Sequence, residues 1–156
     1  MTVRICEAND STHGSCIDLG NPTSAKKHIE REFFKIEVPF QFSPMAMDFQ
    51  DAKVTYSFSG VLFTDSEASL DAKKLVISNK IAPPGSGGSC EGFDDPAGAQ
   101  PIYYLFSDSP FYEGGGTTNS REGIPCYIET LDFNHTADMG PNQITYDITL
   151  FRTLPC

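Results

Sequence analysis

The segment NQITYDITLFRT, residues 142–153, carries the clearest strand pattern in this 156-residue chain. Successive side chains of a strand point to opposite faces of its sheet. Between residues 144 and 150 the even-numbered positions are all apolar or aromatic: Ile144, Tyr146, Ile148 and Leu150. The odd-numbered positions are mostly polar: Thr145, Asp147, Thr149 and Phe151. We expect this last strand to pair with an early one and so to remove an exposed sheet edge.

Six further stretches alternate or form short apolar runs typical of strands. They are TVRIC (2–6), CIDLG (16–20), EFFKIEVPFQFSP (32–44), KVTYSFSGVLFT (53–64), PIYYLFS (101–107) and IPCYIETLDF (124–133). In the third, Pro39 cannot donate to a ladder and indicates an edge position or a bulge. In the fourth, Gly60 indicates a bulge or a bend. The segment GNPTS (20–24) is predicted to break the chain between the second and third strands.

The period changes in DSEASLDAKKLVISNK, residues 65–80, which predicts one amphipathic helix. Asp65 or Ser66 would cap its first turn, and the proline pair at 83–84 would end it near Lys80. The positions that recur at helical spacing and would form the buried face are Ala68, Ala72, Leu75, Val76 and Asn79.

These elements predict a mainly β protein with one α-helix, in a single domain over residues 1–156. Strands placed on both sides of one helix favour a small antiparallel β-barrel or sandwich with the helix on its flank. Long irregular loops rich in glycine are expected at 82–100 and 107–123.

Composition disfavours several partners. Eleven basic residues against 21 acidic ones give a formal charge of −10, with no cationic stripe for a nucleic acid or an anionic membrane. The acidic balance has three readings: solubility, a surface that DNA passes without adhering, or adaptation to high salt. The chain has no apolar run of signal-peptide or membrane-span length, so synthesis in the cytoplasm is expected.

The five cysteines form no CxxC pair, and this pattern favours free thiols in a reducing compartment. It leaves one alternative open, a bond between Cys6 and Cys16 in an oxidising medium. Cys6, His13 and Cys16 are also spaced so that a turn could bring them to one metal ion, but the cluster lacks a second tight pair. We therefore predict no metal site and no cofactor.

No catalytic signature is present. The stretch GSGGSCEGF (85–93) matches neither a nucleophile elbow nor a phosphate-binding loop. A small enzyme using Cys90 or His135 is the weakest of the functional hypotheses. The pair Phe111 and Tyr112, ahead of three glycines, is either an exposed contact for a partner or sugar, or an anchor that holds the loop against the barrel.

The order of motifs from Val54 to Thr153 carries a resemblance. A strand ends in GVLF (60–63), a helix with Leu75 and Val76 follows, and the chain continues through PIYYLFS to PCYIETLDFNHTADMGPNQITYDITLFRT (125–153). This series resembles the small tail-tube and baseplate-hub proteins of tailed phages and tailed archaeal viruses. The long loops depart from a plain tube pattern and favour a baseplate, hub or tail-completion component.

The resemblance implies a non-enzymatic β-barrel subunit that forms a homo-oligomeric ring around the tail channel of a virion. Its partners would be copies of itself and other tail or baseplate proteins, while DNA would pass through the lumen without specific binding. Ile148 and Phe151 on the last strand, with Phe111 and Tyr112, are the expected assembly contacts. The alternative is a virion-surface or secreted-type β-sandwich that recognises a carbohydrate or receptor through its aromatic loops.

Overall fold

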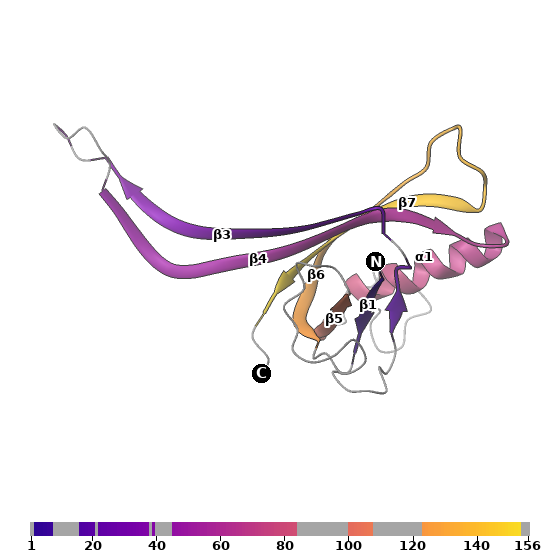
Figure 1. The fold of residues 1–156 in the computed structure, drawn as a ribbon, viewed down its shortest axis with the longest axis horizontal. Helices are drawn as coiled ribbons and strands as arrows, with labels where there is room; N and C mark the ends of the chain where they lie inside the picture. The colour runs from indigo at the N-terminus through magenta and orange to yellow at the C-terminus, as the bar shows by residue number, and fades with distance from the viewer. Residues whose placement is uncertain are drawn as a thin grey trace.

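The computed structural model describes residues 2–7, 16–20, 22–37, 39, 45–83, 100–107 and 123–153, with backbone alone at 34 and 45–51. Its elements in chain order are β1 (Val3–Cys6), β2 (Ile17–Asp18), β3 (Ser24–Ile36), β4 (Met45–Phe63), α1 (Glu67–Ile81), β5 (Tyr103–Ser107), β6 (Ile124–Asn134) and β7 (Gln143–Arg152). All strand pairs are antiparallel, in the order β2-β1-β5-β6-β7-β4-β3 (Figure 1). The prediction of a mainly β, antiparallel protein with one helix is confirmed.

The closing strand behaves as its sequence pattern predicts. β7 lies between β6 and β4, and the four even-numbered residues of its predicted inner face are all buried. One hydrophobic core gathers these with residues from the other strands and the helix: Val3, Ile5, Ile17, Leu19, Tyr56, Phe58, Leu62, Leu70, Ile77, Tyr103, Leu105, Ile124, Cys126, Ile128, Ile144, Tyr146, Ile148 and Leu150. β7 thus lies within the sheet and contributes to the core, and it does not close a barrel.

The sheet is curled but open, because its end strands β2 and β3 do not pair with each other. They are nevertheless consecutive in the chain. The Leu19 N–H donates to Val3 O (3.0 Å) on the β1 side, and the Thr23 N–H donates to Ser59 O (2.8 Å) on the β4 side. The Leu19 and Thr23 nitrogens are four residues apart, and four residues span at most about 14 Å. The two sheet edges must therefore approach each other at this end.

We call residues 19–23 the crossing segment, and β7 and β4 hold it from inside the sheet. The Tyr146 hydroxyl donates to Leu19 O (3.1 Å), and Gly20 turns the chain with φ +69°. A Cβ atom on Gly60 would lie 3.0 Å from the Tyr146 hydroxyl oxygen and 3.1 Å from Pro22 Cα. The ladder between β4 and β7 continues in register through Gly60, so the predicted bulge is wrong. The glycine is required for close approach.

The helix has the predicted cap but a different buried face. Ser66 is the N-cap, and its side chain accepts a hydrogen bond from the Ser69 N–H (3.2 Å). The buried residues are Leu70 and Ile77, whereas Leu75 and Val76 of the predicted face are exposed. The branched side chains two turns apart bury more apolar area than the alanines that suggested the other face. No helix in the described ranges is long and apolar enough to cross a membrane.

Gln100, which precedes β5, and Tyr103, the first residue of β5, hold the last turn of α1. The Tyr103 hydroxyl donates to Lys80 O (2.8 Å), and Gln100 Nε2 donates to both Ile81 O (3.0 Å) and Ile128 O (3.1 Å). These bonds satisfy carbonyls that a helix end leaves without an intrahelical partner. They also fix α1 to β6, because the Ile128 N–H donates back to Gln100 Oε1 (2.7 Å).

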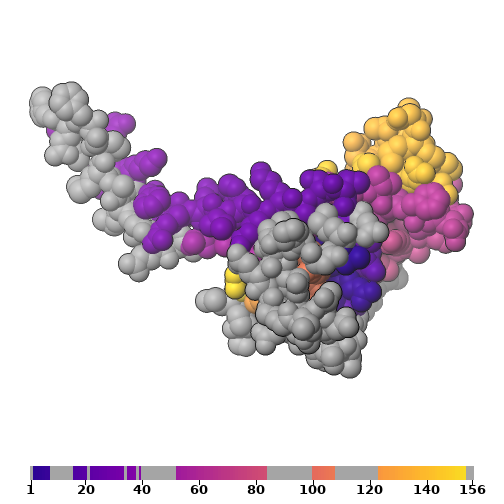
Figure 2. Space-filling model, viewed as in Figure 1, coloured from indigo at the N-terminus to yellow at the C-terminus, as the bar shows by residue number. Residues whose placement is uncertain are grey.

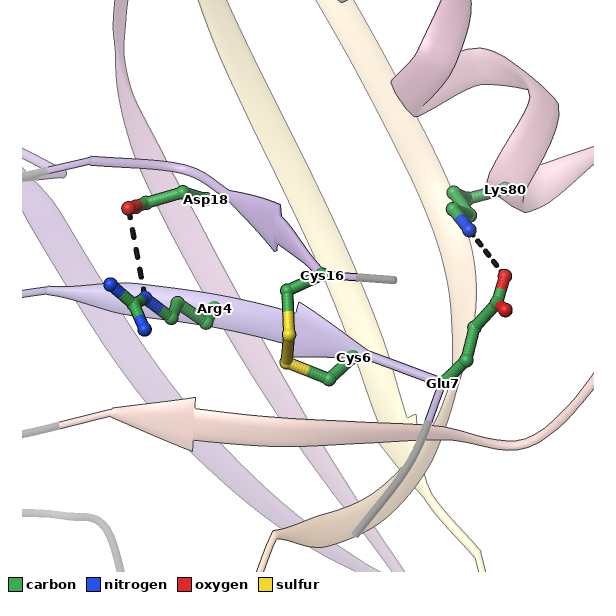
Figure 3. Close-up of a disulfide and its surroundings, with 6 residues drawn as sticks. All are labelled: Arg4, Cys6, Glu7, Cys16, Asp18 and Lys80. Atoms are coloured by element: carbon green, nitrogen blue, oxygen red, sulfur yellow. Dashed lines mark hydrogen bonds and ion pairs between the residues drawn. A yellow bond between two sulfur atoms is a disulfide. The ribbon is translucent and has the colours of Figure 1, made fainter. Parts of the chain in front are cut away.

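The cysteines differ from the favoured prediction of free thiols, which is wrong for one pair. Cys6 and Cys16 form a disulfide between β1 and the residue that precedes β2 (Figure 3). The bond adds to an exposed ion pair between Arg4 and Asp18 and to one between Glu7 and Lys80. Cys126 is a free, buried thiol. Two sulfurs of the proposed metal cluster are therefore already bonded to each other.

Packing at the crossing segment gives a first prediction. Gly60→Ala should lower the free energy of unfolding by about 1–3 kcal/mol, because the added methyl overpacks against Tyr146 and the Pro22 backbone. Urea unfolding followed by circular dichroism measures this. Gly140→Ala is the matched control, since its Cβ would meet only Asn142 Oδ1 at 3.4 Å. Equal stability of the two variants would contradict the close-approach account.

Buried titrating groups give a second prediction. Burial, with a smaller contribution from Glu7 or Asp18, raises the pKa of both Tyr103 and Tyr146 to about 12, and burial raises that of Cys126 to about 12. Folding favours the neutral form of each group, so its contribution is complete below the unfolded pKa, about 8.5–10, and is lost as pH rises toward 12. The free energy of unfolding should therefore fall between pH 9 and 12. Tyr103→Phe and Tyr146→Phe together should flatten that slope, and an unchanged slope would contradict it.

The disulfide gives a third prediction. It closes a sequence separation of 10 residues, a loop for which chain entropy predicts about 2–3 kcal/mol of stabilisation. A thiol reductant should lower the free energy of unfolding by that amount. The variant with both Cys6→Ala and Cys16→Ala should start at the lower stability and show no response to reductant. A response in that variant would place the effect elsewhere.

Candidate functional site

The most distinctive surface is the outer part of the β3–β4 hairpin, which projects beyond the rest of the sheet (Figures 1 and 2). β4 is 19 residues long, yet β7 pairs only with its stretch from Thr55 to Phe63. From Val54 back to Met45, β4 pairs in the described structure with β3 alone. We call the ribbon formed by residues 29–36 and 45–54 the arm.

The sequence pattern accounts for only part of this arm. The predicted strand covers 32–44, whereas β3 begins at Ser24 and includes AKKHIER (25–31), which has no apolar alternation. β3 is an edge strand, so beyond the body both of its faces meet solvent and polar residues are tolerated on either face. The end of the predicted strand, including Val38, Phe40 and Phe42, lies outside the described residues.

A register shift divides the arm. Arg31 pairs with Ala52 and Phe33 pairs with Asp48, so β4 advances four residues where β3 advances two. Extra residues in one strand of a ribbon bend it and increase its twist, and the arm in Figure 1 is visibly curved. The bend turns the outer part of the arm relative to the sheet from which it comes.

The face of β3 that continues the core side of the sheet carries a mixed row. Ala25 packs on the core, and the same face continues along the arm with Ile29, Arg31, Phe33 and Lys35. We call these last four residues the arm row. Ile29 is 62% exposed and Phe33 48%, although both are large apolar side chains. The row combines apolar and cationic groups in a chain whose net charge is −10.

Two observations indicate that the arm lacks stabilising contacts in the single chain. A two-stranded ribbon is at best marginally stable alone in water and needs a third strand or a packed face. Exposed apolar side chains on a ribbon with open backbone edges are the features that other chains bind. The arm is therefore suited to become ordered and covered in an assembly.

The predicted contact residues lie in different environments. Ile148 is 1% exposed and belongs to the core, so a substitution there would test folding instead of assembly. Phe151 is half-buried on the other face of β7, where its ring lies 5.5 Å from that of Tyr127 and 5.8 Å from Lys53 Nζ. Phe111 and Tyr112 lie outside the described residues, as does the hypothetical nucleophile Cys90.

Phe151 lies at the root of the arm. It pairs with Thr55, the last β4 residue that β7 accompanies, and the Lys53 ammonium over its ring forms an ion pair with Glu129 of β6 (3.0 Å). Ring stacking and the cation above the ring each add of the order of 0.5–1 kcal/mol at such exposed sites. These contacts hold the point where the arm leaves the sheet.

The two histidines that the structure describes lie on separate, exposed parts of the chain. His135 is exposed in the β6–β7 turn, with Nε2 3.0 Å from Gly140 O. His28 lies on β3 with Nε2 3.9 Å from Glu30. In the part of the chain that the structure covers, no three His, Cys, Asp or Glu side chains are grouped to hold a metal ion.

Comparison with known proteins gives a limited result. No protein-family model matches the chain, and no curated protein matches it in sequence. Among solved structures, the chain is similar to chains of the tail of an empty gene transfer agent particle with C6 symmetry and of a native gene transfer agent virion. Each match has 11% sequence identity and a TM-score of 0.47, and covers 99% of this chain and 92% of the other. At this level of similarity, the role of the chain has to be inferred from its own residues.

Proposed function

We propose that this chain is a non-enzymatic structural subunit that assembles with copies of itself through its arm. The observation that carries the proposal is the arm itself, a two-stranded ribbon with Ile29 and Phe33 exposed and with outer edges that no other described strand pairs. A free monomer gains nothing from such a ribbon, whereas an assembly buries it.

The proposed assembly is a ring in a viral tail, as a baseplate, hub or tail-tube component. The motif series from Val54 to Thr153 supports the tail placement, because it resembles the small β-barrel proteins of such tails. The strongly acidic composition is compatible with a channel through which DNA passes without adhering. The other partners would be neighbouring tail proteins above and below the ring.

Size measurement tests this proposal. The wild-type protein should form a closed oligomer by light scattering, and electron micrographs should show rings. The double variant Ile29→Asp, Phe33→Asp should weaken association by about tenfold or more, because two apolar contacts become buried carboxylates. It should retain the unfolding free energy of the wild type within about 1 kcal/mol, since both side chains are exposed in the subunit.

Val76→Asp on α1 is the matched control. Val76 is 53% exposed and apolar like the arm residues, but it lies on the helix, away from the arm. It should leave assembly unchanged. A wild-type protein that stays monomeric at high concentration, or one that binds glycans as a monomer through Phe111 and Tyr112, would overturn the proposal in favour of a binding module.

A further inference from the structure

A second surface on the same chain has the properties needed to receive the arm row. It lies on the outer face of the sheet, where β4, β7 and β6 run side by side in register. Val61 and Phe63 of β4 are 47% and 59% exposed there. Thr145 pairs with Val61 on β4 and with Asn134 on β6, so all three strands contribute to this face.

Two carboxylates lie on the same face. Asp147 pairs in register with Ser59 on β4 and with Asp132 on β6, and both aspartates are exposed. The Ser59 hydroxyl donates to Asp147 Oδ1. Among the described residues, ion pairs of the body join Lys53 to Glu129, Arg4 to Asp18, Lys74 to Asp71 and Lys80 to Glu7, and neither Asp132 nor Asp147 takes part in one. We call Val61, Phe63, Asp132 and Asp147 the outer patch.

The outer patch carries an electrostatic cost in the isolated chain. Like charges directly opposite each other on neighbouring strands destabilise a sheet, and Asp132 and Asp147 are such a pair. A cation brought between them by another molecule would relieve the repulsion. Exposed apolar side chains two positions apart on the adjoining strand would be covered by the same contact.

We infer that the outer patch is the docking site for the arm row of a second copy of this chain. The two surfaces are complementary in both respects: Arg31 and Lys35 supply cations for the aspartates, and Ile29 and Phe33 supply apolar groups for Val61 and Phe63. The inference rests on the proposed assembly through the arm and specifies where the arm binds. A nucleic acid is a poor occupant of the arm row, since the chain that presents it has a net charge of −10.

In the proposed ring, the contact joins two different surfaces of neighbouring subunits and is heterologous. A heterologous contact repeated head to tail closes into a ring when its rotation permits, and otherwise extends into a filament. Each subunit then gives one arm and receives one arm. This geometry would explain why one chain carries both the arm and the outer patch, each with exposed apolar and charged side chains.

Mixing two defective variants tests the inference. The arm variant (Ile29→Asp, Phe33→Asp) and the patch variant Phe63→Asp should each assemble at least about tenfold more weakly than the wild type when alone. Mixed in equal amounts they should form a one-to-one complex and nothing larger, because only the intact arm of one fits the intact patch of the other. Light scattering measures the mass, and urea unfolding verifies that each variant is folded.

Charge exchange supplies the second measurement. Arg31→Glu with Lys35→Glu, or Asp132→Lys with Asp147→Lys, should each weaken assembly by about tenfold, and all four changes in one chain should restore most of it. Asp132→Lys alone serves if loss of the Ser59 bond to Asp147 unfolds the double variant. Wild-type assembly by the patch variants would overturn the docking site and leave arm-mediated assembly intact. A monomeric wild-type protein would overturn both.

Discussion

The crossing segment sets the shape of this fold, because it is the short connection between β2 and β3, the two end strands of the sheet. The chain passes from the Leu19 bond with β1 to the Thr23 bond with β4 within four residues, which span at most about 14 Å. The sheet has to curl until its ends approach, and curling encloses the core on one side. Tyr146 on β7 donates a hydrogen bond to the segment, and Gly60 provides the space beneath it.

Two strands, β3 and β4, are long enough to extend beyond the core. β4 is shared, with its C-terminal half paired to β7 in the body and its N-terminal half paired only to β3 in the arm. Contacts among Phe151, Tyr127 and Lys53 stabilise the point where β4 leaves the body of the sheet and enters the arm. The arm is thus an extension of the best-packed part of the molecule instead of a separate hinged element.

The sequence predicts the elements whose burial is one-sided and uniform. β7 alternates because one of its faces meets the core along its whole length, and Ser66 is recognisable because a helix N-terminus needs an acceptor. The sequence predicts the wrong helix face, because Ala68 and Ala72 have helical spacing but bury less apolar area than Leu70 and Ile77. The sequence offers the Cys6–Cys16 bond only as an alternative, since spacing alone cannot show that β1 and β2 lie side by side.

The arm and the outer patch were not predictable in the same way. AKKHIER has no apolar period, because an edge strand beyond the body faces solvent on both sides. Counting every second residue would have aligned Ile29, Arg31, Phe33 and Lys35, but only knowledge of the pairing shows that this face is uncovered. The outer patch depends on the register of three strands, which brings together residues more than 80 positions apart in the sequence.

The continuity of β4 links folding to association. Because the same strand passes from the core into the arm, any partner that holds the arm binds the folded chain and not the unfolded one. Mass action then adds the free energy of binding to that of folding, by roughly 2.7 kcal/mol when the partner is at a hundred times its dissociation constant. In the proposed ring, each subunit is held at both surfaces, so the particle as a whole would tolerate heat and denaturant that unfold its free components.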